Sequence, residues 1–144
     1  MTSEEKFPFW LEHAEYDLEA AESMFQSGKW VYVVFMCQQA IEKLVKGLYL
    51  LYLDEEPPKI HDINRLLSKF EGKLPEEVGE EKVQLFSDLG MYYLNTRYPE
   101  YKRELYLKTS RQVAENFLKR TKESYQWLMT LSPLKDSSGS TLPT

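Results

Sequence analysis

The segment from Trp30 to Leu53 constrains the fold more than any other part of the chain, because it is apolar over most of its length and contains no turn signal. Its first part, Val31 to Cys37, is rich in β-branched and aromatic residues, and alone it would fit a buried strand. Strands usually end within about ten residues, whereas this pattern continues to Leu51. We therefore predict a helix at the centre of a helical bundle.

A membrane-spanning interpretation of this segment is disfavoured by its polar residues, since each charge in lipid costs roughly 3 kcal/mol. The amide and charged side chains that a span would bury are Gln38, Gln39, Glu42, Lys43 and Lys46. The first residues lack a signal-peptide pattern, because charges come first and Pro8 interrupts the apolar stretch. The single Cys37 excludes an internal disulfide framework and a Cys-rich zinc site. We expect a cytoplasmic protein that needs no metal or other cofactor.

The rest of the chain repeats apolar residues at the three- and four-residue steps typical of helices. Pro8 suits a first helical turn, Asp62 is a capping residue type, and Thr109 has capping-box spacing to Gln112. The predicted helices span about residues 8–27, 30–53, 62–70, 75–95 and 109–132. Four substantial helices and one short one predict an all-α fold, an antiparallel up-and-down four-helix bundle with an additional short helix.

The length of 144 residues fits one domain. We assign residues 1–132 to the bundle. Residues 133–144 are mostly polar or small, which predicts a disordered tail.

Four polar residues of the apolar segment share one helix face, because they stand at positions i, i+3, i+4 and i+7. They are Gln39, Glu42, Lys43 and Lys46. One interpretation is that this face is the solvent side of the helix. The other is a polar groove that binds a partner or a nucleotide phosphate.

Most motifs of enzyme chemistry are absent from the sequence, including a glycine-rich phosphate loop, HExxH, paired cysteines and GxSxG. The chain has two histidines. His13 falls on the charged side of its helix, where a solvated surface role is expected. His61 precedes the predicted cap Asp62, which fits either a local structural role or catalysis.

Basic residues gather late in the sequence. Eight basic and three acidic residues lie between Arg97 and Lys122, although the whole chain has a net charge of −5. Such asymmetry can steer an anionic ligand, and tyrosines in the same region can stack on bases. These tyrosines are Tyr98, Tyr101 and Tyr106. Exposed helix faces are charged in any soluble protein, so the ordinary interpretation also stays open.

Three blocks of this sequence, taken together, resemble the HEPN domain family. They are Gln38-Gln39-Ala40 with Glu42, Lys43 and Lys46, then His61-Asp62-Ile63 with Leu66, then Thr96-Arg97-Tyr98-Pro99-Glu100. Their order and spacing match from about Trp10 to Trp127. The resemblance implies a helical bundle that commonly forms a homodimer. It also implies association with a minimal nucleotidyltransferase partner, often as a toxin–antitoxin pair.

Many HEPN proteins are metal-independent endoribonucleases, whose usual active site is an Arg followed by four to six residues and a His, assembled with its copy across the dimer. Arg97 matches the Arg, but no histidine follows it. Attack by a 2′-hydroxyl needs a base and an acid with pKa values near neutrality, which Arg and Tyr do not provide. The resemblance therefore does not extend to the usual ribonuclease chemistry.

We expect a homodimeric module that docks a nucleotidyltransferase-type partner and binds a nucleotide or RNA, with no catalytic residue. The candidate binding residues are Gln39, Glu42, Lys43, Lys46, His61, Asp62, Arg97 and Tyr98. The alternative is an endoribonuclease toxin in which His61 replaces the missing histidine and converges with Arg97. A third interpretation is a purely structural dimer with Tyr93 and Tyr98 at its seam.

Overall fold

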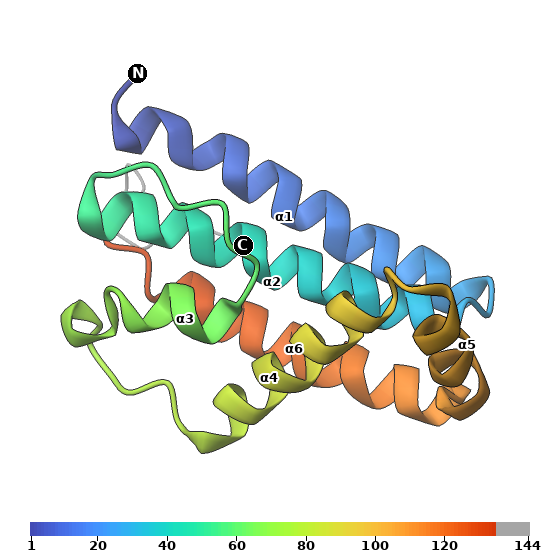
Figure 1. Ribbon diagram of the computed structural model, residues 1–144. Helices are drawn as coiled ribbons and strands as arrows, with labels where there is room; N and C mark the ends of the chain where they lie inside the picture. The colour runs from blue at the N-terminus through green and yellow to red at the C-terminus, as the bar shows by residue number, and fades with distance from the viewer. Residues whose placement is uncertain (135–144) are drawn as a thin grey trace.

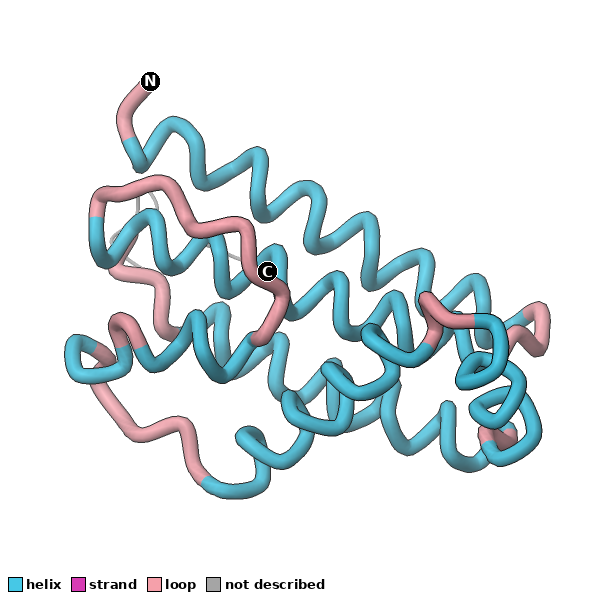
Figure 2. Tube along the Cα trace, viewed as in Figure 1, coloured by secondary structure: helices cyan, strands magenta, loops and turns pink. Residues whose placement is uncertain are grey.

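A computed structural model describes residues 1–134, and within this range the chain forms helices and no strands (Figures 1 and 2). The helices are α1 (Ser3–Gln26), α2 (Trp30–Leu53), α3 (Ile63–Ser68), α4 (Glu80–Asn95), α5 (Pro99–Lys108) and α6 (Arg111–Thr130). A single 3-10 turn, Glu71–Lys73, follows α3. The all-α prediction is confirmed, with α1, α2, α4 and α6 as the long helices. Most of the predicted tail, residues 135–144, lies outside the described residues.

The helix α2 lies at the centre of the bundle, as its sequence predicts, and it packs mainly against α1, α6 and α4. Figure 1 shows α1 and α2 side by side along their whole length. They approach closely at Gly47, where a Cβ atom would lie 3.0 Å from the Phe7 ring and 3.1 Å from Trp10 Cβ. No helix within residues 1–134 has both the length and the apolar character that crossing a bilayer requires.

Two predicted helix starts are wrong because the capping residues differ from those expected. The helix α1 begins at Ser3, five residues before Pro8, and the Thr2 side chain accepts a hydrogen bond from the Glu5 N–H at 3.1 Å. The helix α4 begins at Glu80 and not at Pro75. Gly79 precedes it with a φ of 85°, a conformation that glycine adopts without a steric penalty.

The region after α4 also differs from the prediction. Pro99 ends the predicted fourth helix, but in the structure it also occupies the first position of an additional short helix, α5. The next helix, α6, is capped by Ser110, whose hydroxyl accepts from the Val113 N–H at 3.2 Å. Thr109, the predicted cap, is instead buried, with its hydroxyl 2.9 Å from Tyr92 Oη.

Candidate functional site

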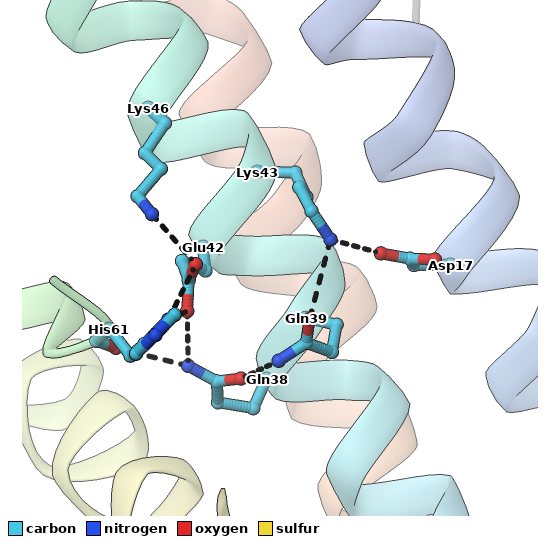
Figure 3. Close-up of polar contacts among 7 residues, drawn as sticks. All are labelled: Asp17, Gln38, Gln39, Glu42, Lys43, Lys46 and His61. Atoms are coloured by element: carbon cyan, nitrogen blue, oxygen red, sulfur yellow. Dashed lines mark hydrogen bonds and ion pairs between the residues drawn. The ribbon is translucent and has the colours of Figure 1, made fainter. Parts of the chain in front are cut away.

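A buried carboxylate on α2, that of Glu42, organises the polar side chains near the middle of the bundle (Figure 3). It accepts hydrogen bonds from Gln38 Nε2 and Lys46 Nζ, both at 3.0 Å. His61 Nδ1 lies 3.1 Å from both of its oxygens. Burial alone would raise the pKa of Glu42, but the hydrogen bonds from Gln38 and Lys46, the charge of Lys46 and the contact with His61 outweigh burial and lower it. The carboxyl group is therefore ionised at neutral pH.

Glu42 determines how the imidazole of His61 is presented. An ionised carboxylate only accepts hydrogen bonds, so His61 Nδ1 must carry a proton and donate it. Gln38 Nε2 also donates to the backbone carbonyl of His61 at 3.1 Å, which fixes the loop that precedes α3. No hydrogen bond to His61 Nε2 occurs within residues 1–134, and the side chain is 47% exposed. Nε2 is therefore free to meet a ligand.

The same network continues from α2 to α1 (Figure 3). Gln39 Nε2 donates to Gln38 Oε1 at 2.7 Å. Lys43 Nζ donates to Gln39 Oε1 at 3.3 Å and pairs with Asp17 Oδ2 of α1 at 2.9 Å. The four polar residues of the predicted face therefore point in two directions, toward α1 and toward His61.

The interpretation of that face as the solvent side of α2 is wrong for two of its four residues. Glu42 is 3% exposed and Lys46 is 7% exposed. His61, in the loop before α3, contacts Glu42, which in turn pairs with Lys46, and the spacing of residues along α2 alone cannot reveal the contact with this loop. Gln39 and Lys43 are half-buried, and Lys43 pairs with Asp17 of α1.

A cavity of about 490 Å³ lies beside His61, between α3 with its preceding loop and α4. Asn64 Nδ2 donates to the Val83 carbonyl at 3.0 Å, which ties α3 to the first turn of α4. The polar lining includes His61, Asp62, Arg65, Ser87 and Arg97. The apolar lining includes Ile60, Phe86, Met91 and Leu94. This size and this mixture are typical of small-molecule sites, which measure roughly 300–1,000 Å³.

Tyr93 of α4 holds two polar residues of this cavity in place. Its ring centroid lies 4.8 Å from that of His61, and the Arg97 guanidinium carbon lies 5.7 Å from the same ring. Arg65 and Arg97 form no ion pair within residues 1–134. Two arginines without an ion-pair partner in this range and one histidine thus line one cavity, an arrangement suited to a phosphate.

A larger hollow of about 930 Å³ lies along the loop between α3 and α4. Its lining includes Glu71, Glu76, Glu77 and Glu80 and no basic residue. It would repel the anions that the His61 cavity suits. Within residues 1–134, no group of three or more His, Cys, Asp or Glu side chains is arranged to hold a metal ion.

The structure separates the sequence-derived candidates into three sets. His61, Asp62 and Arg97 line the cavity, and Asp62 also caps α3 by accepting from the Arg65 N–H at 3.1 Å. Glu42 and Lys46 lie behind His61, whereas Lys43 pairs with Asp17 of α1 and Gln39 accepts from Lys43. Tyr98 is 53% exposed, packs edge to face on Tyr101 and does not line the cavity.

Three residues that shape this site were not among the candidate binding residues predicted from the sequence. Gln38 adjoins the predicted polar face, and its spacing of four residues from Glu42 was an available signal. Arg65 lies one turn after the cap Asp62 and so enters the same cavity. Tyr93 carried no signal for its place beside His61, because that contact joins distant parts of the sequence.

Comparison with known proteins identifies the family. The family model of the HEPN domain matches residues 7–131. The chain belongs to the HEPN domain family. This confirms the resemblance carried by the three sequence blocks, and no curated protein matches the chain significantly.

Two solved structures are similar to this HEPN protein. TT1696 from Thermus thermophilus is 29% identical with a TM-score of 0.69, over 85% of this chain and 95% of that one. ST0689, described as an archaeal HEPN homologue, is 22% identical with a TM-score of 0.64, over 85% of this chain and 93% of that one. The second likeness supports the fold alone.

Proposed function

We propose that this HEPN protein is a nucleotide-binding module whose site is the cavity beside His61. The observation that carries the proposal is that His61, Arg65 and Arg97 line one cavity of about 490 Å³. The guanidinium groups would hold a phosphate, because hydrogen bonds from a cation to an anionic oxygen are stronger than neutral ones. His61 would donate or accept through Nε2, since Glu42 occupies Nδ1. Among the candidates from sequence, Gln39, Lys43 and Lys46 would support this site without touching the ligand.

Calorimetry with adenosine 5′-monophosphate tests this proposal. Arg97→Gln removes a cavity charge and should weaken binding at least ten-fold. Arg103→Gln is the matched control, because Arg103 is exposed on α5 and does not line the cavity. No binding by the unaltered protein at millimolar nucleotide, or equal losses in both variants, would contradict a site at this position.

We further propose that the module is homodimeric and docks a nucleotidyltransferase-type partner in a toxin–antitoxin-like pair. Family membership supports this, since HEPN domains are commonly dimeric. Light scattering would measure the oligomeric state, and co-purification with a co-expressed nucleotidyltransferase would test the partner. A monomer that retains no such partner would refute this part and leave nucleotide binding untouched.

A second candidate function is metal-independent RNA cleavage, and the pairing of His61 with Glu42 favours it. A proton on Nδ1 leaves Nε2 of a neutral imidazole able to accept the proton of a 2′-hydroxyl, while Arg97 would stabilise the charge that develops on the phosphate. The 2′-oxygen would attack the phosphorus, the bond from phosphorus to the 5′-oxygen would break, and the leaving 5′-oxygen would take a proton from water. Gel analysis of RNA treated with the unaltered protein and with His61→Ala separates the two functions. Cleavage that depends on His61 supports catalysis, and no cleavage leaves binding as the function.

A further inference from the structure

The helix α4 contains a glycine at the cavity wall that neither its backbone nor its packing requires. Gly90 lies inside the helix without a positive φ, unlike Gly28 and Gly79. A Cβ atom placed on it would meet no heavy atom within 4 Å. A helix-interior glycine is less favourable than alanine, because it loses more backbone entropy on folding. The fold alone therefore gives no reason for the missing side chain.

The effect of this glycine is to leave open space in the cavity that Gly90 lines. Its apolar neighbours in the cavity lining are Phe86, which is buried, and Met91 and Leu94, which are 55% and 52% exposed, whereas Ser87 is polar. Exposed apolar side chains next to a position without a side chain form a surface on which a flat, apolar ring can lie.

A basic residue of the cavity lining, Arg97, follows Gly90 in the sequence. Gly90 and Leu94 lie at i and i+4 of α4, and Arg97, two residues after the last residue of this helix, lines the same cavity. The Arg97 N–H donates to the Leu94 carbonyl at 3.4 Å, so the chain makes one further turn after Leu94. A ligand that reaches both positions has an apolar ring at one end and an anion at the other.

We propose that Gly90 is the specificity-determining residue of the cavity, because its missing side chain admits the base of a nucleoside monophosphate. The base lies over Gly90 against Met91 and Leu94, and the phosphate lies at Arg97. This inference rests on the proposed nucleotide binding and adds the orientation of the ligand and the residue that admits the base.

The test compares a ligand that has a base with one that lacks it. Calorimetry would measure adenosine 5′-monophosphate and ribose 5-phosphate with the unaltered protein and with Gly90→Ala and Gly90→Leu. Gly90→Leu should weaken binding of the nucleotide at least ten-fold, and Gly90→Ala should weaken it less. Both should bind ribose 5-phosphate as the unaltered protein does, because Arg97 is unchanged. Gly72→Leu is the control, since Gly72 is equally open but lies outside the cavity.

The outcomes separate this inference from the proposed function. Binding of the nucleotide by the unaltered protein and equally by folded Gly90→Leu overturns the role of Gly90 alone. Equal losses of both ligands in Gly90→Leu also overturn it, because the base would then not be the part that lies over Gly90. No nucleotide binding by the unaltered protein overturns both proposals. Circular dichroism verifies folding, and if Gly90→Leu and Gly90→Met both fail to fold, the space at Gly90 is not open and the inference falls.

Discussion

Two polar regions meet at His61, and they differ in whether their charges have partners. On the α2 side, Glu42 pairs with Lys46 and His61, and Lys43 pairs with Asp17. On the α4 side, Arg65 and Arg97 line the cavity without an ion pair inside the described range. Where charges are buried in pairs, the stability of the fold depends on each partner. Exposed charges without a partner contribute little to stability and are available to a ligand.

The two glycines of the long helices show the same difference. Gly47 allows α1 to approach α2, since a Cβ there would press on Phe7 and Trp10. Gly90 faces open space. Packing within the chain thus requires the first glycine and not the second. Stability should therefore respond to changes on the α2 side, and binding to changes on the α4 side.

The largest expected effect is from Glu42→Leu. This change leaves Lys46 buried without its partner, and breaking a buried pair in this way costs about 3–5 kcal/mol. Arg97→Leu should cost less than about 1 kcal/mol, because it removes only an exposed contact with Tyr93. Urea denaturation would measure both.

The double variant Glu42→Leu/Lys46→Met sharpens this test. It should recover part of the loss, since apolar replacements of both charges need no partner. Equal stabilities of Glu42→Leu and the unaltered protein would show that the α2 network does not support the fold.

A smaller effect is expected at the two glycines. Gly47→Leu should destabilise the protein by roughly 1–3 kcal/mol, because the added atoms overpack the contact with Phe7 and Trp10. Gly90→Leu should not lower the unfolding temperature, since its side chain enters open space and gains helix propensity. Thermal unfolding followed by circular dichroism would compare them. Similar losses in both variants would remove the distinction between the two glycines.

The central helix was predictable from sequence, because a long apolar pattern with no turn signal has few alternatives. The short helix α3 and its cap Asp62 were also predictable, since the cap residue and the apolar spacing agree. The helix α5 was not, because only Leu105 of its ten residues is buried and the pattern of an amphipathic helix is therefore weak. Pro99 was used to predict the end of the fourth helix, but nothing in the pattern indicated that it is also the first residue of α5.

The candidate site was predictable only in part. His61, Asp62 and Arg97 came from the family blocks, and they line one cavity. Which polar residues of α2 are covered could not be read from their spacing, since the cover comes from a loop some twenty residues later in the chain. Whether these residues bind a nucleotide remains a prediction.

The lowered pKa of Glu42 predicts an effect of acid on the α2 network. Its folded pKa lies below the ordinary value of 4.5, so the stability that its ionised form contributes is fully present above about pH 4.5 and is lost as the pH falls through the folded pKa. The effect should be smaller than that of Glu42→Leu, because protonation keeps the side chain in place. Urea denaturation of the unaltered protein and of Glu42→Gln from pH 7 to pH 3 would measure it. Their difference in free energy should shrink as the pH falls below 4.5, and a difference that does not shrink there would contradict the lowered pKa.

The smallest expected effect concerns the ion pair between Asp17 and Lys43, which joins α1 to α2. Their side chains are 16% and 23% exposed, between the fully buried and the fully exposed cases. A double-mutant cycle with Asp17→Asn and Lys43→Met should therefore give a coupling energy of about 1 kcal/mol. Raising the salt concentration should reduce it only slightly, because partly buried pairs are weakly screened. A coupling that vanishes at 0.5 M salt would mean that the pair is solvated, and that the network holding His61 ends at Gln39 without extending to α1.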